Sequence, residues 1–203
     1  MKIGPRYKRA RRLGADIFEK TQSPKYAMRA ASKTSKRGAR GGYGKSDFGM
    51  QLHEKQRARY LYGIGERQFA RYVATAITRR ASPAEALFVS LESRLDNVLY
   101  RLGIAPSRQA ARQLAAHGHF IVNNKRVTIP SFSLSVGDVI KVRPGSVGKQ
   151  PLINLADKIR DRNTPPWLSF NAAKGESTVV ATPKFVRTEI LFDIAAVLQF
   201  YSR

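Results

Sequence analysis

Residues 41–46 (GGYGKS) could hold a nucleotide phosphate, because Gly-Lys-Ser closes the phosphate-binding loop of many NTPases. That loop needs another glycine five residues before Gly44, and Ala39 occupies this position. It also has to follow a buried strand, whereas residues 33–40 are polar and charged. The pattern therefore favours a flexible basic connector. An NTP-driven RNA enzyme stays an alternative, which nucleotide turnover dependent on Lys45 would reveal.

Cysteine and histidine residues do not form a recognisable metal site. The sequence has no cysteine, so disulfide bonds and cysteine-bound zinc are excluded. His117 and His119 lie at the end of a predicted helix, but no third or fourth ligand is near them in the sequence. The favoured role of both is packing at the helix end. We expect no metal and no other cofactor.

Glu92 and Asp96 are the carboxylates most suited to acid and base chemistry, because they are four residues apart in a predicted helix. Arg94 and Arg101 lie close to both of them in the sequence. This spacing favours a structural network of ion pairs, and no nucleophile is paired with a base. We expect no enzymatic activity.

Positive charge is the dominant property of the chain. Its 203 residues include 37 Lys and Arg against 14 Asp and Glu, a net charge of +23. Such a surplus argues against an enzyme for a small neutral substrate and makes nucleic acid the expected partner. The hydrophobic fraction of 42% is close to that of globular proteins, and no apolar run approaches the roughly 20 residues that span a bilayer. We expect a cytosolic protein with no membrane partner.

The N-terminal region carries over half of this charge. Residues 1–45 contain 14 Lys and Arg, and the only acidic residues among them are Asp16 and Glu19. Residues 27–45 have almost no apolar periodicity and are rich in Gly, Ser and Lys, which predicts a basic arm that becomes ordered on its partner. A solvated tail with no specific target is the alternative.

Helical periodicity replaces this pattern from Asp47 onward, and strand periodicity follows from Phe120. Capping residues and glycines mark the helix ends. The expected elements are a helix from Asp47 to near Gly63, helices over 65–79, 83–102 and 108–116, a hairpin of strands 120–122 and 126–129, a strand over 139–143, a helix over 151–160, a corner at 165–168 and an apolar stretch over 189–201.

These elements would place basic and polar residues on one small folded surface. Arg108 and Arg112 share a helix face, residues 123–125 form the hairpin tip, and Lys141 and Arg143 belong to the last predicted strand. No zinc-finger or leucine-zipper spacing is present. The pattern therefore favours structured RNA over a DNA groove.

Three stretches closely resemble the RNA-binding module named after small-subunit ribosomal protein S-four. They are residues 92–103 (ESRLDNVLYRLG), 107–114 (SRQAARQL) and 121–127 (IVNNKRV). Upstream, residues 62–69 (YGIGERQF) resemble the stretch that bacterial S-four proteins carry ahead of the module, and residues 166–168 (PWL) resemble a C-terminal landmark of that family. The module is similar to part of some pseudouridine synthases too, but too few residues follow it here for their catalytic domain.

The chain differs from many members of the S-four family at a position linked to zinc. Those members hold a zinc ion with cysteines in the N-terminal arm, one of them within a Ser-Pro-Lys-Cys sequence. Here Ser23-Pro24-Lys25 is followed by Tyr26. The chain therefore resembles the zinc-free branch, in which RNA and neighbouring side chains must order the arm.

The resemblance and the periodicities together indicate an α+β protein that is mostly helical. The expected parts are a basic N-terminal arm (1–45), the first part of a helical domain (46–91), an inserted helix-helix-hairpin RNA-binding module of the S-four type (92–150), and a C-terminal part that packs with the helical domain (151–203).

The resemblance implies a structural protein of the small ribosomal subunit in the cytoplasm. It implies primary binding to the 5′ domain of small-subunit rRNA, nucleation of the assembly of the subunit body, and a contribution to translational accuracy. The implied neighbours are ribosomal proteins S-five and S-twelve and the mRNA near the path by which it enters the subunit. A free-standing RNA chaperone with little preference among folded RNAs is the alternative from another class.

The residues that we expect at the RNA are basic or polar. They are Arg6, Arg9, Arg11, Arg12, Lys36, Arg37, Arg40, Lys45, Arg57, Arg67, Arg71, Arg94, Arg108, Arg112, Asn123, Lys125, Lys141 and Arg143. Arg40 and Lys45 are the candidates for the side that faces the mRNA path. The candidates for rRNA phosphates are Arg67, Arg108, Arg112 and Lys125.

Overall fold

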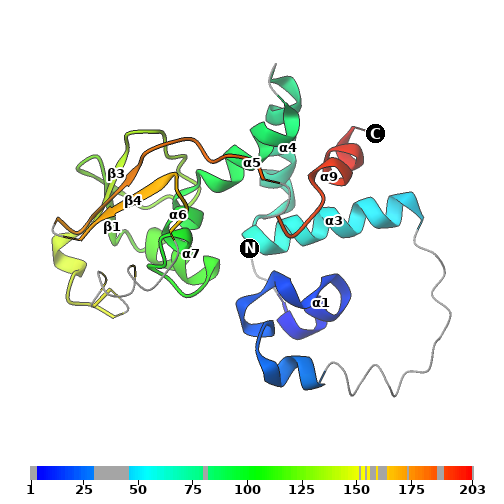
Figure 1. The fold of residues 1–203 in the computed structure, drawn as a ribbon, viewed down its shortest axis with the longest axis horizontal. Helices are drawn as coiled ribbons and strands as arrows, with labels where there is room; N and C mark the ends of the chain where they lie inside the picture. Colours follow the sequence, from blue (N-terminus) through cyan, green and yellow to red (C-terminus); the bar gives the residue numbers. More distant parts are fainter. Residues whose placement is uncertain are drawn as a thin grey trace. The chain divides into compact units, whose positions relative to one another are not determined.

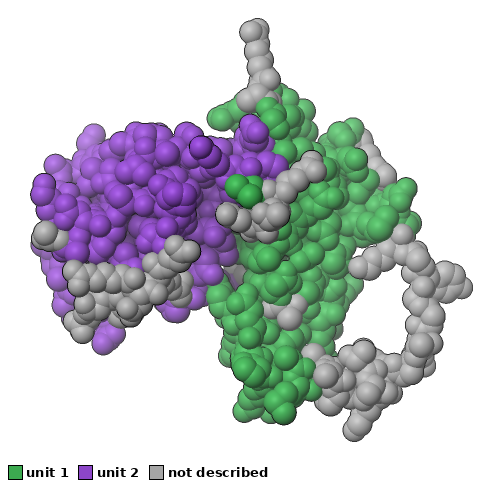
Figure 2. Space-filling view, viewed as in Figure 1, with its two compact units in different colours: residues 1–84, 186–203 green, residues 85–185 purple. Residues whose placement is uncertain are grey.

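The chain forms two compact units, which Figure 2 distinguishes by colour. One unit consists of residues 1–84 and 186–203, and the other of residues 85–185. The structure is a computed structural model, and it describes residues 4–29, 46–79, 82–150, 152–153, 155, 159, 164–172, 174–186 and 190–202. We call the two parts unit 1 and unit 2.

Unit 1 is helical (Figure 1). Its α-helices include α1 (Arg6–Leu13), α3 (Asp47–Tyr62), α4 (Glu66–Thr78) and α9 (Ile194–Tyr201), and residues 24–29 are helical as well. Two short 3-10 helices, η1 (Ala15–Ile17) and η2 (Glu19–Thr21), follow α1. Helix α3 begins and ends as predicted, because the Ser46 hydroxyl accepts a hydrogen bond from the Gly49 amide and Gly63 adopts a left-handed conformation.

Helix α9 packs on α3 and α4 through a buried lysine. The Lys55 ammonium lies 3.1 Å from a Glu66 carboxylate oxygen and 4.1 Å from the centre of the Phe200 ring. The Tyr201 hydroxyl donates to the same carboxylate at 2.6 Å. Burial alone would raise the pKa of Glu66, but the hydrogen bonds from Tyr201 and Lys55 and the charge of Arg59 lower it below its usual value. This polar contact ties the C-terminal helix to unit 1.

The first part of the predicted arm is folded. Ala10, Ile17 and Phe18 form a small core with Tyr60 of α3, and Tyr26 packs against that core. Tyr26, at the position that follows Ser-Pro-Lys, lies parallel to the Tyr7 ring at a centroid distance of 5.7 Å. Residues of the predicted basic arm therefore pack on α3 through their few apolar side chains, ahead of residues 27–45, for which the sequence predicts no packed core. Residues 30–45 lie outside the described residues.

Unit 2 begins with three helices, α5 (Pro83–Glu92), α6 (Leu95–Arg101) and α7 (Arg108–Ala116). The prediction of a single helix over 83–102 is wrong, because the helix is interrupted at Ser93 and Arg94. The Leu95 and Asp96 amides donate to the carbonyls of Phe132 and Pro130, and the Leu134 amide donates to the Ser93 carbonyl. The leucine spacing continues across the break, so periodicity alone could not reveal these long-range bonds.

A five-stranded antiparallel sheet follows, with strand order β2-β1-β3-β5-β4. Its strands are β1 (Phe120–Val122), β2 (Lys125–Val127), β3 (Val139–Val142), β4 (Leu168–Asn171) and β5 (Glu176–Val179). The hairpin and β3 agree with the sequence prediction, whereas β4 and β5 were not predicted. Because β5 pairs with β3, residues that we expected to pack with the helical domain extend the sheet of unit 2 instead.

One apolar core joins the helices of unit 2 to the sheet. Leu95, Leu99, Leu114, Phe120 and Ile140 are among its buried members. The predicted helix over 151–160 falls mostly outside the described residues, although Leu152 and Ile159 are buried in the same core. No helix in the described parts of the chain is both long and apolar enough to cross a membrane.

Gly118 forms the turn between α7 and β1, and its backbone conformation requires glycine. Its φ is +70°, and a Cβ atom there would lie within 3 Å of the Arg126 guanidinium. We predict that Gly118→Ala destabilises the protein by about 1–2 kcal/mol in urea unfolding, because an L-residue is strained in this conformation. Gly65→Ala is the matched control, since its φ is −70° and no atom lies within 4 Å of the added carbon. Equal losses in the two variants would contradict the prediction.

Candidate nucleic-acid interface

The α6–α7 region of unit 2 is built around the buried carboxylate of Asp96. The Arg94 side chain donates to both of its oxygens, at 3.0 and 2.7 Å. Arg112, from α7, donates to Oδ2 through Nε and Nη2 at 3.0 and 2.9 Å. Asp96 is 3% exposed and Arg94 is 1% exposed, so the shared carboxylate is largely shielded from water. The ion pairs fix the Arg112 side chain relative to α6.

Glu92 organises a second set of contacts beside the first. Arg101 forms a two-point ion pair with it at 2.8 and 2.9 Å, and the Asn97 amide donates to it at 2.9 Å. The side-chain oxygen of Asn97 (Oδ1) in turn accepts a hydrogen bond from Arg108 Nε at 2.8 Å. The Arg108 guanidinium lies 4.4 Å from the centre of the Tyr100 ring. The predicted ion-pair network around Glu92 and Asp96 is therefore present, although the two carboxylates do not share one helix.

This network divides the arginines that sequence reasoning assigned to RNA. Arg94 is buried, so it cannot reach a phosphate, and its assignment as an RNA contact is replaced by a structural role. Arg108 and Arg112 are partly exposed on α7, with part of each guanidinium held by a neighbouring side chain. They meet the condition for a preformed phosphate contact, which is an arginine head held in one geometry at the surface.

The hairpin tip has a structural residue and an exposed lysine. Asn123 and Asn124 adopt positive φ values of 48° and 62°, as the predicted turn requires. Asn123 donates to the Asp138 carboxylate at 2.7 Å and accepts from the Val139 amide at 2.9 Å. Its side chain therefore holds the tip against β3, although the residue is exposed. Lys125 is exposed beside it.

Lys141 of β3 and Arg143, which follows β3, differ in their surroundings. Lys141 forms an ion pair with Glu176 of β5 at 2.8 Å, so part of its charge is neutralised by its own sheet. Arg143 is half-buried, and its Nε has no hydrogen-bond partner among the described residues. A buried donor without an acceptor is unusual in a folded protein and is a place where an incoming acceptor would be favourable.

Arg143 belongs to a group of basic side chains near the end of α7 that we call the histidine cluster. Its members are His117, His119, Arg126, Arg143 and Lys149. Burial, and then the electrostatic effects of His117, Lys149, Arg143 and Arg126, lower the pKa of His119. Sequence reasoning found Arg143 but missed Arg126 and Lys149. Arg126 lies in the hairpin, next to the predicted contact Lys125, which was the available signal.

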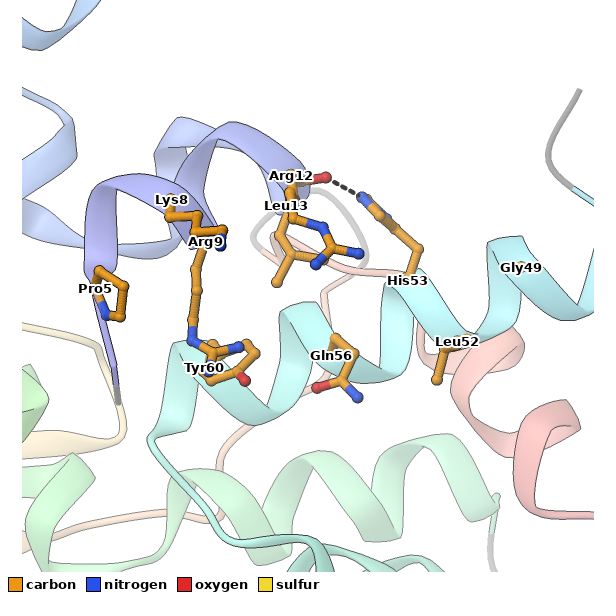
Figure 3. Close-up of a pocket in the computed structure, with 10 residues that line it drawn as sticks. All are labelled: Pro5, Lys8, Arg9, Arg12, Leu13, Gly49, Leu52, His53, Gln56 and Tyr60. Carbon is orange, nitrogen blue, oxygen red and sulfur yellow. Dashed lines mark hydrogen bonds between the residues drawn. The ribbon is translucent and has the colours of Figure 1, made fainter. Parts of the chain in front are cut away.

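In unit 1, α1 and α3 bring several predicted basic residues to one region (Figure 3). Arg9 crosses from α1 to α3, where its guanidinium lies 4.5 Å from the centre of the Tyr60 ring. Arg57 pairs with Asp16 at 2.6 Å, so it helps to hold the N-terminal segment. Arg11 and Arg12 are exposed, and Arg6 is partly exposed.

Two of the remaining predicted contacts lie on another helix of unit 1. Arg67 and Arg71 are exposed on α4. Lys36, Arg37, Arg40 and Lys45 lie outside the described residues. Among the residues that the structure does describe, no group of three or more His, Cys, Asp or Glu side chains could hold a metal ion.

Comparisons with known proteins assign both units to one family. The Ribosomal protein S4/S9 N-terminal domain matches residues 1–92, and the S4 domain matches residues 93–140. The chain is 43% identical to the small ribosomal subunit protein uS4 of Chloroflexus aurantiacus, over 99% of this chain and 98% of that protein. The chain belongs to the uS4 family. It is also 39% identical to the uS4 protein of Cutibacterium acnes, over 98% of each chain, and 40% identical to that of Chromobacterium violaceum.

Membership of the uS4 family confirms the resemblance that the motifs predicted. The chain is a structural protein of the small ribosomal subunit and not an enzyme, with rRNA as its partner and the cytoplasm as its location. The α+β fold class is confirmed as well.

The Asp96 carboxylate gives a first test of the site. We predict that Asp96→Asn destabilises the uS4 fold by about 3 kcal/mol in urea unfolding, because the buried Arg94 charge then loses the Asp96 carboxylate. Glu85→Gln, at an exposed position of α5, should change stability by less than about 0.5 kcal/mol. An Asp96→Asn variant as stable as this control would show that the buried network does not hold the fold.

His119 gives a second test, through pH. Since its pKa is lowered in the folded protein, the unfolded chain binds a proton more readily, and stability falls as pH drops below about 6.5. His119→Asn keeps a side chain that can bond with the Ser146 hydroxyl but does not titrate. We predict a smaller decrease in Tm between pH 7.5 and 5.5 for this variant than for the unmodified protein. Superimposable pH profiles would refute the assignment.

Proposed function

We propose that this chain is a primary binder of the 5′ domain of small-subunit rRNA and that it nucleates assembly of the subunit body. The observation that carries the proposal is the pair of arginines on α7, Arg108 and Arg112, held in place through Asn97 and the buried Asp96. Phosphate contacts made by such fixed groups require one arrangement of the RNA backbone, so they select RNA by shape.

Charge and shape would have separate roles in this binding. The net charge of +23 releases counterions from the RNA whatever its sequence, which supplies affinity and speed of association. The histidine cluster and the exposed Lys125 lie in the same unit as the α7 arginines, so several phosphates could be held by one folded body. A junction of RNA helices held in this way would have a fixed geometry for later steps of assembly.

We propose a smaller set of RNA contacts than the sequence indicated. Arg57, Arg94, Asn123 and Lys141 leave the set because their side chains are used in contacts within the fold, and Arg126 and Lys149 join it with the histidine cluster. Apart from Arg40 and Lys45, the proposed contacts are Arg6, Arg9, Arg11, Arg12, Lys36, Arg37, Arg67, Arg71, Arg108, Arg112, Lys125, Arg126, Arg143 and Lys149.

We propose further that Arg40 and Lys45 face the path by which mRNA enters the subunit. On this proposal the chain adjoins ribosomal proteins S-five and S-twelve and contributes to translational accuracy. The support is the resemblance of the sequence to the S-four family together with the charge of the segment around these two residues. Misreading by ribosomes that carry Arg40→Ala or Lys45→Ala would be measured with a nonsense-suppression reporter, and unchanged misreading in both would count against this role.

The rRNA proposal is tested by filter binding of the full chain to the 5′ domain of small-subunit rRNA, with excess tRNA as competitor. Binding that survives the competitor supports a specific scaffold. Binding that tRNA abolishes would overturn the proposal and favour the RNA-chaperone alternative, because charge alone does not discriminate among folded RNAs.

The salt dependence of the same assay tests an individual contact. We predict that Lys125→Ala lowers the magnitude of the slope of log Kobs against log salt concentration by about 0.7–0.9, the amount for one lost phosphate contact. Lys174→Ala removes an equally exposed charge at the β4–β5 turn, outside the proposed contacts, and should leave the slope unchanged. The same slope in both variants would mean that Lys125 does not contact a phosphate.

A further inference from the structure

A hollow of about 650 Å³ lies between facing sides of α1 and α3 in unit 1 (Figure 3). The two helices are joined at its edges. His53 of α3 bonds with the Arg12 carbonyl at 3.0 Å, and Arg9 of α1 reaches the Tyr60 ring. Because both sides come from helices that pack on a shared core, the hollow is a preformed feature of the folded N-terminal segment.

The charge around the hollow favours an anion. Lys8, Arg9 and Arg12 line it, and no carboxylate does among the described residues. Two acidic side chains of the neighbouring segments are already engaged, since Asp16 pairs with Arg57 and Glu54 bonds with His53 and the Asp193 amide. An anionic group in the hollow would therefore meet three cations and no competing negative charge.

The size and the apolar part of the lining favour more than a phosphate. Leu13, Leu52 and Tyr60 contribute to the walls, and a volume of several hundred cubic ångströms is typical of small-molecule sites. The Arg9 guanidinium covers the Tyr60 ring, and its Nε has no hydrogen-bond partner among the described residues. Aromatic rings and arginine planes are the surfaces on which proteins stack unpaired RNA bases.

Gln56 adds a group that could distinguish one base edge from another. Its side-chain oxygen accepts from Arg59 at 3.2 Å, which fixes the orientation of the amide. Gln56 is one of the residues that line the hollow, and the amino group of its amide is a donor. An acceptor on a base edge is the complementary group.

We propose that this hollow receives one unstacked nucleotide of the rRNA. Its phosphate lies on Lys8 and Arg12, its base stacks on the Arg9 guanidinium that covers the Tyr60 ring, and the Gln56 amino group donates to the base edge. The proposal rests on the proposed binding of rRNA and adds to it a point at which a single base is recognised. The folded segment 4–29 then contributes selectivity as well as charge.

The test is chemical probing of the 5′-domain rRNA bound to the full chain, combined with filter binding. The unmodified protein should protect the base edge of one unpaired nucleotide from dimethyl sulfate or carbodiimide. Gln56→Leu should remove that protection, weaken binding about tenfold and leave the salt slope unchanged, because a hydrogen bond is lost and no charge is. Leu52→Trp, which fills the hollow, should remove the same protection.

Gln199→Leu is the matched control, because Gln199 is an exposed glutamine of unit 1 that also accepts one side-chain hydrogen bond, from Gln51. It should preserve both the protection and the affinity, and melting curves check that all variants are folded.

Identical protection patterns for the unmodified protein, Gln56→Leu and Leu52→Trp would overturn the proposal while leaving rRNA binding intact. If the unmodified protein neither protects any nucleotide nor binds the rRNA specifically, the proposed function itself is overturned. A third outcome would also overturn the proposal. If 1 mM UMP or AMP saturates the hollow while Gln56→Leu and Leu52→Trp leave the protection and the affinity of the rRNA unchanged, the hollow binds a free nucleotide instead.

Discussion

Two buried carboxylates, those of Glu92 and Asp96, hold the helices of unit 2 together. Asp96 connects the start of α6 to α7 through Arg94 and Arg112, and Glu92 connects the end of α5 to α6 through Asn97 and Arg101. Breaking either set would leave charge inside a medium of low dielectric, which costs more than the net gain of making it. The positions of Arg108 and Arg112 follow from these contacts, so the proposed selection of RNA by shape would depend on two of the 14 acidic residues of the chain.

Acidic side chains also join the helices of unit 1. Asp16 fastens the N-terminal segment to α3 through Arg57, and Glu66 joins α4 to α3 and α9 through Lys55, Arg59 and Tyr201. In a chain with a net charge of +23, these anions reduce local repulsion where helices meet, and the outward arginines and lysines keep their charge for RNA. Stability and binding therefore draw on the same arginines, part of whose donors face inward.

Local sequence signals predicted much of this fold. Ser46 and Gly63 mark the ends of α3, Ser107 caps α7, and the asparagine pair makes the hairpin turn, all as expected, because each feature depends on neighbouring residues. The break at Arg94 and the strands β4 and β5 could not be predicted, since they depend on hydrogen bonds to distant segments. In the site, clustering of basic residues identified the region. It could not separate Arg94, buried against Asp96, from the exposed Lys125.

The central claim is that the RNA-binding geometry of α6 and α7 exists before RNA arrives. Hydrogen exchange of the free protein and of its complex with the 5′-domain rRNA, followed by mass spectrometry over residues 94–116, tests it most directly. The account predicts slow exchange of these amides in the free protein and little change on binding, because the buried ion pairs already hold both helices. Fast exchange in the free protein that becomes slow only in the complex would contradict it and would mean that the RNA folds this region.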